Sequence, residues 1–258
     1  MAAQAWRTCA IAALSVAATC SITGIALGSG MAWEAEMTTA GSEPQVVRVL
    51  TAPQRFKIQP RDGGTEYLVR LDRGEVYFID AKKRTYQKVQ LTELERAAAN
   101  AREHMQLALK HMQKELESLP PEQRRLLEHM VGERQAAATK AKVRKTGKTK
   151  TIAGYRCSEY VAEAEGKTLL TACTTDQIPA FRELRKDWLT AQQRLGKLNP
   201  FGGRNLQETY GEIPGFPLET EMGGVRAVVT KVDTTAPPET EFEVPQGFEL
   251  RPGPPLPR

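Results

Sequence analysis

The chain has 258 residues, of which 40% are hydrophobic, 26% charged and 6% aromatic, a composition typical of one or two globular domains with a sizeable core. Its formal net charge is +5. The low aromatic content argues against a protein that stacks on nucleic-acid bases, so we do not expect nucleic acid as a partner.

The first 32 residues differ from the rest of the chain. One positive charge, Arg7, precedes an uncharged apolar run, which is followed by "GMA" ending at Ala32. This pattern is typical of a secretory signal peptide over residues 1–32, cleaved after Ala32. Two alternatives stay open: a retained N-terminal anchor helix, and a lipoprotein attached at Cys20, although Thr19 precedes this cysteine where a smaller residue is expected. The sequence thus predicts export, to the periplasm or alternatively to the cell exterior.

Two cysteines remain after the predicted cleavage, Cys157 and Cys173. An even number of cysteines in an oxidising compartment predicts a disulfide bond. The two positions lie symmetrically about Glu165, so a hairpin that turns near Glu165-Gly166 would bring them opposite each other. We therefore expect a structural Cys157–Cys173 bond, and no C-x-x-C spacing suggests redox catalysis.

Short alternating segments between turn residues predict an antiparallel meander over residues 33–90. Its strands are expected in "WEAEMTT", "QVVRVL", "RFKIQ", "EYLVRLD", "EVYFID" and "TYQKV". Later strands are expected in "KTIAGYRCSEYVAEA", in "KTLLTACTT" and in a hairpin that turns at Gly223-Gly224. "FEVPQGFEL" is expected as a last short strand or turn. One domain is thus predicted over residues 33–250, followed by a mobile proline-rich tail over 251–258.

Helical periodicity begins at Leu91. Apolar residues recur there every three or four positions as far as Leu119, which predicts an amphipathic helix. Pro120-Pro121 end this helix and suit the first turn of a second one, so a helical hairpin is expected over about 91–137. A third helix is expected from Ile178 to Leu195. Helices between groups of strands indicate the α+β class, with the helices on one face of an antiparallel sheet.

The segment from Arg134 to Lys150 has seven basic residues and no acidic one. One interpretation is a solvated connector between the helical hairpin and the next strands. The alternative is a surface that contacts the anionic cell envelope, because clustered lysine and arginine attract anionic headgroups.

The sequence patterns of common catalytic sites are absent. The chain contains no G-x-S-x-G, no H-E-x-x-H, no P-loop and no G-x-G-x-x-G, which are the motifs of the corresponding hydrolases and nucleotide-binding enzymes. No serine outside the predicted signal peptide has a context that suggests activation. We therefore expect a protein that is not an enzyme and has no cofactor.

Each of the three histidines is followed by a methionine. His104 and His111 are seven residues apart, about 10.5 Å along a helix, which is too far for one metal ion. Across the predicted hairpin, however, His111 and His129 are equidistant from the proline turn and would lie level with Met112 and Met130. Histidine and methionine suit copper, so a copper site is the alternative to an ordinary packing stripe.

Five stretches, in this order, carry a resemblance to a known family. They are "LVRLDRGEVYFIDAKKRTYQKV", "LPPEQRRLLEHM", "TIAGYRCSEYV" with the later "TAC", "GFPLETEM" and "FEVPQGFEL". Together they resemble a family of exported bacterial proteins, domain-of-unknown-function family 4412. The resemblance covers nearly all of the predicted mature chain. It implies a fold similar to the periplasmic lipoprotein carriers (LolA-like): a strongly curved antiparallel sheet, half a barrel, with helices on its concave side. It implies no catalytic residues.

Such a half-barrel implies an apolar or lipid-like ligand held between sheet and helices. The candidate lining residues are Met105, Met112, Phe181 and Trp188. Copper binding by the hairpin and an envelope structural or protein-interaction module are the alternatives. A deep apolar cavity under the helices would favour the ligand, whereas a filled interior would favour the structural module.

Overall fold

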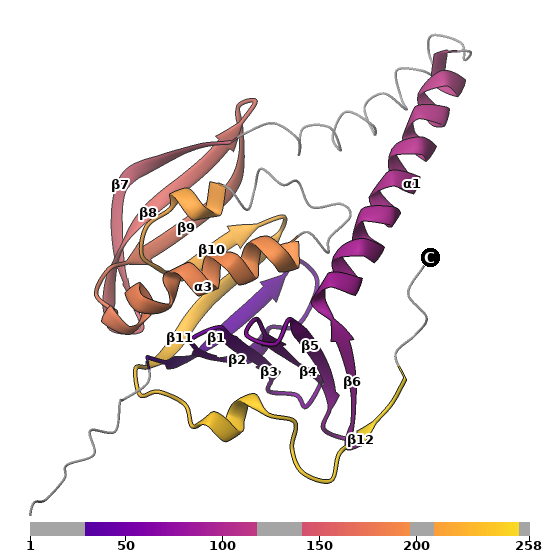
Figure 1. Cartoon of the computed structure of the whole chain (residues 1–258). Helices are drawn as coiled ribbons and strands as arrows, with labels where there is room; N and C mark the ends of the chain where they lie inside the picture. Colours follow the sequence, from indigo (N-terminus) through magenta and orange to yellow (C-terminus); the bar gives the residue numbers. More distant parts are fainter. Residues whose placement is uncertain (1–28, 118–140, 197–208, 253–258) are drawn as a thin grey trace, which may run out of the picture.

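The computed structural model describes residues 29–117, 141–196 and 209–252. Within them, one open, mostly antiparallel sheet of twelve strands forms the body of the protein, and a helix lies across one of its faces (Figure 1). This confirms the predicted α+β class and the large antiparallel sheet.

The first half of the chain forms the predicted meander. Its strands are β1 (Met31–Thr39), β2 (Gln45–Ala52), β3 (Arg55–Pro60), β4 (Thr65–Arg70), β5 (Glu75–Asp80) and β6 (Thr85–Gln90). Each pairs antiparallel with the next. Met31 and Ala32, which precede the predicted domain start at residue 33, already pair with β2 and are buried.

The second half of the chain extends the sheet from β1. Its strands are β7 (Lys142–Ile152), β8 (Tyr155–Ala164), β9 (Lys167–Thr175), β10 (Phe216–Met222), β11 (Val225–Asp233) and β12 (Glu249–Leu250). The order is β12-β6-β5-β4-β3-β2-β1-β11-β10-β9-β8-β7. The predicted turns at Glu165-Gly166 and Gly223-Gly224 are confirmed, because all four residues have positive φ, as type I′ hairpin turns require.

Strand β7 corrects the interpretation of the basic segment as a connector. Residues from Lys142 onwards pair with β8 as the edge strand of the sheet. The sheet bends so that Lys150 in β7 forms an ion pair with Glu219 in β10, two strands beyond its neighbour β8. Residues 134–140 of the basic segment lie outside the described residues.

Helix α1 (Leu91–Glu117) confirms the first helix of the predicted hairpin, and the second predicted helix lies outside the described residues. Leu91 is fully buried, whereas Leu107 and Met112 are exposed. Figure 1 shows why: α1 leaves the end of β6 and projects away from the sheet. The expectation that this helix covers the sheet is therefore wrong beyond its first turns.

Helix α3 (Pro179–Gly196) agrees with the predicted third helix and crosses the concave face of the sheet (Figure 1). It buries Phe181, Leu184 and Ala191. Phe181 packs edge-on against Phe216 of β10, with ring centroids 5.0 Å apart, an orientation that aromatic pairs favour. The first turns of α1 meet the end of α3, where Arg194 forms hydrogen bonds with Glu95.

The predicted disulfide bond between Cys157 and Cys173 is confirmed. It joins β8 to β9, with 5.4 Å between the two Cα atoms. Cys173 pairs directly with Glu159 rather than with Cys157, so the bond crosses the two strands diagonally and not straight across as predicted. Both cysteines are buried in the cluster that also contains Phe181 and Phe216.

Part of the convex face is covered by a C-terminal strap, residues 239–250, which includes the short 3₁₀ helix η1 (Glu239–Phe242) and β12. Phe242 enters a cluster with Leu50, Leu68, Tyr77 and Ile79 of the sheet. The acidic residues of the strap meet basic residues of β3, of β4 and of the turn that follows β4. The pairs are Glu239 with Arg55, Glu241 with Lys57, and Glu243 with Arg70 and Arg73.

Arg70 is the buried centre of this arrangement. Its guanidinium donates hydrogen bonds to the carboxylates of Asp72 and Glu243 and to the carbonyl oxygen of Phe242. The hydrogen bond from Arg70 lowers the pKa of Asp72. Partial burial raises the pKa of Glu243, but the hydrogen bonds from Arg70 and Arg73 outweigh it, so that this pKa is also lowered.

Acid is therefore expected to destabilise the protein. A carboxyl group whose pKa is lower in the folded state stabilises the fold above its unfolded pKa, and this contribution is lost as the pH falls through the folded pKa. For Asp72 and Glu243 the loss should begin below about pH 4. Urea titrations monitored by tryptophan fluorescence should give a lower midpoint at pH 3 than at pH 7. The Glu243→Gln variant should show a smaller decrease than the wild type, and an equal decrease would contradict the assignment.

Candidate functional site

The interior beneath α3 is filled by aromatic rings. Trp188 packs against Trp33, Phe56 and Phe181, with ring centroids 5.6, 5.9 and 6.3 Å away. Its indole N–H is buried without a hydrogen-bond partner among the described residues. Phe181 and Trp188 thus lie together as predicted, but as parts of a packed aromatic cluster.

The other two predicted lining residues, Met105 and Met112, lie elsewhere. Both belong to α1, which meets α3 only at its first turns. At 1.5 Å per residue, Met105 is about 21 Å and Met112 about 32 Å along the helix from Leu91. Because α1 projects away from the sheet, the prediction that all four residues line one cavity is wrong.

The alternative metal site falls partly outside the described residues. His111 and Met112 lie on α1, whereas His129 and Met130 belong to the part of the chain that the structure does not describe. Within the described ranges there is no group of three or more histidine, cysteine or acidic residues that could hold a metal ion.

An open depression lies on the concave face, beyond the edge of α3. Its apolar floor is formed by Tyr67 of β4 and Phe78 of β5, which are cross-strand neighbours with ring centroids 5.7 Å apart in an edge-to-face arrangement. Tyr67 is 42% exposed. The row continues to Ile58 of β3, which pairs with Tyr67 and is partly buried. The sheet therefore presents a short aromatic surface that α3 does not cover.

The rim of this depression is polar. Asp80, Lys83, Gln87 and Arg251 line it together with neighbouring residues, around a volume of about 380 Å³. Asp80 and Lys83 pair with each other at 2.8 Å. The side chains of Gln87 and Arg251, in contrast, have no hydrogen-bond or ion-pair partner within the described part of the chain. Within the described ranges, a cation and an amide thus lie unpaired beside an aromatic floor.

Arg251 is placed at the depression by the end of the strap. Strand β12 pairs in parallel with β6, and the backbone N–H of Arg251 donates to the carbonyl oxygen of Tyr86 at 2.8 Å. Glu249 pairs with Thr85, so by alternation Arg251 and Gln87 face the same side of the sheet. Arg251 could not be predicted as a site residue, because nothing in "FEVPQGFEL" predicts a parallel pairing with a strand more than 160 residues earlier.

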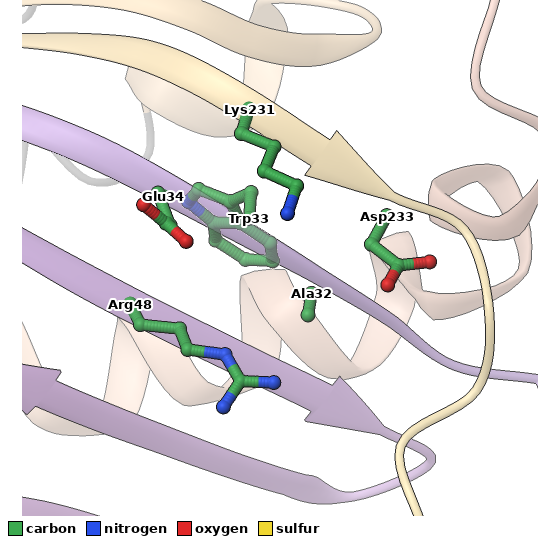
Figure 2. A pocket seen from close by; sticks show the side chains of 6 residues that line it. All are labelled: Ala32, Trp33, Glu34, Arg48, Lys231 and Asp233. Atoms are coloured by element: carbon green, nitrogen blue, oxygen red, sulfur yellow. The ribbon is translucent and has the colours of Figure 1, made fainter.

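A second depression, of about 210 Å³, lies on the opposite face of the sheet at the start of β1. Figure 2 shows the charged side chains of Glu34, Arg48, Lys231 and Asp233 around the small Ala32. Glu34 is directly opposite both Arg48 and Lys231 in the paired strands. Cross-strand neighbours of opposite charge stabilise sheets, and the formal charges cancel, so these four residues are best explained as a structural surface.

Three of the five cations of β7 form ion pairs within the protein. Arg144 pairs with Glu163, Lys148 with Glu159 and Lys150 with Glu219. Lys145 lies over the ring of Tyr160, 5.9 Å from its centroid, a favourable cation–π geometry. These partners reduce the positive potential that the sequence suggests for the anionic-envelope surface, which stays a prediction.

Among the described residues, no helix is both long and apolar enough to span a membrane.

The aromatic depression formed by Tyr67 and Phe78 is the candidate functional site, because it combines exposed aromatic area with polar side chains that have no partner in the described part of the chain.

Comparison with solved structures finds chains of low similarity. No curated protein matches the chain. The structure of PNGF-II has a TM-score of 0.36 and 10% identity, over 87% of this chain and 31% of that chain. The structure of MucB in complex with MucA(peri) has a TM-score of 0.37 and 9% identity, over 86% of this chain and 55% of that chain. The chain thus spans about a third and about half of the length of these proteins.

A family match is more informative than these neighbours. It extends over residues 86–248, more than half of the 258 residues, and confirms the family predicted from the sequence. The protein belongs to the family described as domain of unknown function DUF4412.

Proposed function

We propose that this protein is an exported, non-catalytic binding protein whose aromatic depression takes an amphipathic, lipid-like ligand. The observation that carries the proposal is the exposed ring of Tyr67, packed against the partly buried Phe78, beside Arg251, whose side chain has no partner among the described residues. The apolar part of the ligand lies on the rings, and its anionic or hydrogen-bonding end faces Arg251 and Gln87.

The dimensions support a small ligand. A volume of about 380 Å³ lies at the lower end of the range of ligand pockets, about 300–1,000 Å³. The depression is open to solvent on one side, so it suits one acyl chain segment or ring system rather than a fully enclosed lipid. Because the interior beneath α3 is filled, we propose the site on the uncovered part of the same concave face and not under the helix.

Export is supported by the buried disulfide bond between Cys157 and Cys173. Disulfide bonds form and persist in oxidising compartments and are rare where thiols are kept reduced. A ligand site exposed to the periplasm or the cell exterior is consistent with lipid-like molecules of the envelope.

Two fluorescent probes test the site. 1-Anilinonaphthalene-8-sulfonate has an aromatic body and an anionic group, and N-phenyl-1-naphthylamine has a similar body without charge. We expect saturable binding of both. Tyr67→Ser should weaken both by about 10-fold or more, because burying an aromatic side chain contributes about 1.5–3 kcal/mol. Arg251→Gln should weaken only the anionic probe.

The matched control is Met222→Ser, since Met222 is an apolar residue of similar exposure, 44%, in the distant strand β10. It should leave both affinities unchanged, and circular dichroism should confirm that every variant is folded. If Tyr67→Ser binds both probes as tightly as the wild type, the depression is not the ligand site. Native mass spectrometry of protein purified from its envelope would then identify any natural ligand carried elsewhere.

A further inference from the structure

Residues before the predicted cleavage point, Ala32, already belong to the folded domain. Cleavage after Ala32 would leave Trp33 as the first residue and would remove Met31 and Ala32. Met31 is fully buried in the cluster with Trp33 and Phe216, and its carbonyl oxygen accepts a hydrogen bond from the buried Thr51 hydroxyl at 3.1 Å. These two residues are thus part of the domain core and of the β1–β2 pairing.

Gly30 is also closely surrounded by other residues of the domain. A Cβ atom at this position would lie 3.0 Å from both the carbonyl oxygen of Thr51 and Cδ of Pro237, which is closer than nearly all real Cβ contacts. The backbone at Gly30 therefore passes through a narrow gap between β2 and the segment after β11, and it is buried there.

The side chain of Ser29 contacts helix α3. Its hydroxyl donates a hydrogen bond to the carboxylate of Glu183 on α3. Residues from Ser29 to Ala32 thus contact three separate parts of the fold: β2, the segment after β11, and α3. A mature chain that lacked them would lose all three contacts.

The sequence immediately before Ser29 offers a cleavage site that keeps these contacts. Ala26 and Gly28 are small residues at the third and first positions before the bond between Gly28 and Ser29. This is the A-x-A-like spacing of signal-peptide cleavage. Cleavage after Gly30 would also have small residues at these positions, but it would remove Ser29 and Gly30 from the fold.

We infer that the mature N-terminus is Ser29, produced by a signal-peptide-cleaving endopeptidase. Water hydrolyses the amide bond between Gly28 and Ser29, which leaves a carboxylate on Gly28 and a free α-amino group on Ser29. Because the Ser29 hydroxyl already contacts Glu183, the new α-ammonium group lies close to this carboxylate and is attracted to it. The inference rests on export and is independent of ligand binding.

The full chain, secreted by a bacterial host, tests this site. The protein is purified from the envelope fraction under denaturing conditions, so that recovery does not depend on folding, and it is analysed by intact-mass spectrometry and N-terminal sequencing. We expect one species that begins at Ser29. A species that begins at Met31 or Trp33, or a chain that keeps residues 1–28, would overturn the inference.

Two variants make the assignment specific. Gly28→Leu places a large side chain directly before the inferred bond and should reduce the fraction of chains that begin at Ser29 by more than 10-fold. Ala32→Leu does the same for the alternative bond after Ala32 and should leave the start at Ser29 unchanged. The opposite pattern, with Ala32→Leu blocking cleavage and Gly28→Leu having no effect, would place the cleavage after Ala32.

Discussion

Replacing Phe242 by alanine should lower the free energy of unfolding by about 3–5 kcal/mol, the usual cost of removing a fully buried aromatic side chain. Phe242 is 0% exposed and joins the strap to Leu50, Leu68 and Ile79 of the sheet. Its ring also lies beneath the guanidinium of Arg55, 5.4 Å from the centroid. The alanine variant would leave a cavity and one fewer cation–π contact, while the acidic residues of the strap would remain.

Urea denaturation at pH 7 measures this loss, and thermal denaturation should show a decrease in Tm of roughly 6–20 °C for a domain of this size. Phe248→Ala is the matched control, because Phe248 belongs to the same strap and the same cluster but is only partly buried. Its cost should be less than half as large. A loss below about 1 kcal/mol for Phe242→Ala would mean that the ion pairs alone hold the strap.

Local patterns were sufficient for much of the fold. Alternation and turn residues located β1 to β6, and the hairpin at Glu165-Gly166 predicted the disulfide bond correctly. The predicted register differs from the observed one, since Cys173 pairs with Glu159 and not with Cys157. A symmetric position about a turn fixes which strands meet, but an irregularity between Ala162 and Glu163 shifts the pairing along β8 and β9.

Strand β7 shows what local patterns could not provide. Its residues are mostly lysine, arginine, threonine and glycine, with few of the apolar residues that mark a strand. The strand forms because acids of other strands face its cations, as Glu163 faces Arg144 and Glu219 faces Lys150. These partners are 19 and 69 positions away along the chain, so only the tertiary structure brings them together.

The candidate site was predicted only in outline. The apolar stripe of α1 was correctly assigned to a helix, but periodicity cannot give the direction in which a helix leaves the sheet. The predicted Met105 and Met112 therefore lie far from Phe181 and Trp188. Tyr67 and Phe78 were placed on strands, whereas their uncovered position depends on where α3 ends. The sequence thus indicated the concave face of the sheet as the place of the candidate site, whereas its position on that face follows only from the structure.

Removing the disulfide bond is expected to cost about 3 kcal/mol. The two cysteines are 16 positions apart, and closing a loop of about 15 residues reduces the entropy of the unfolded chain by roughly this amount. The double variant Cys157→Ala, Cys173→Ala should therefore unfold at a lower urea concentration than the wild type. Its circular-dichroism spectrum should stay like that of the wild type, because β8 and β9 are also joined by their backbone pairing.

Treatment with a reductant separates the effect of losing the disulfide bond from the effect of removing two sulfur atoms from the core. Wild-type protein unfolded and refolded in excess reductant should lose most of this stability, whereas the double variant should be unaffected by reductant. Both cysteines are only 1% exposed, so the folded wild type should resist reduction until it opens. Rapid reduction of the native protein without a change in its urea midpoint would show that the bond neither is protected by the core nor stabilises the hairpin.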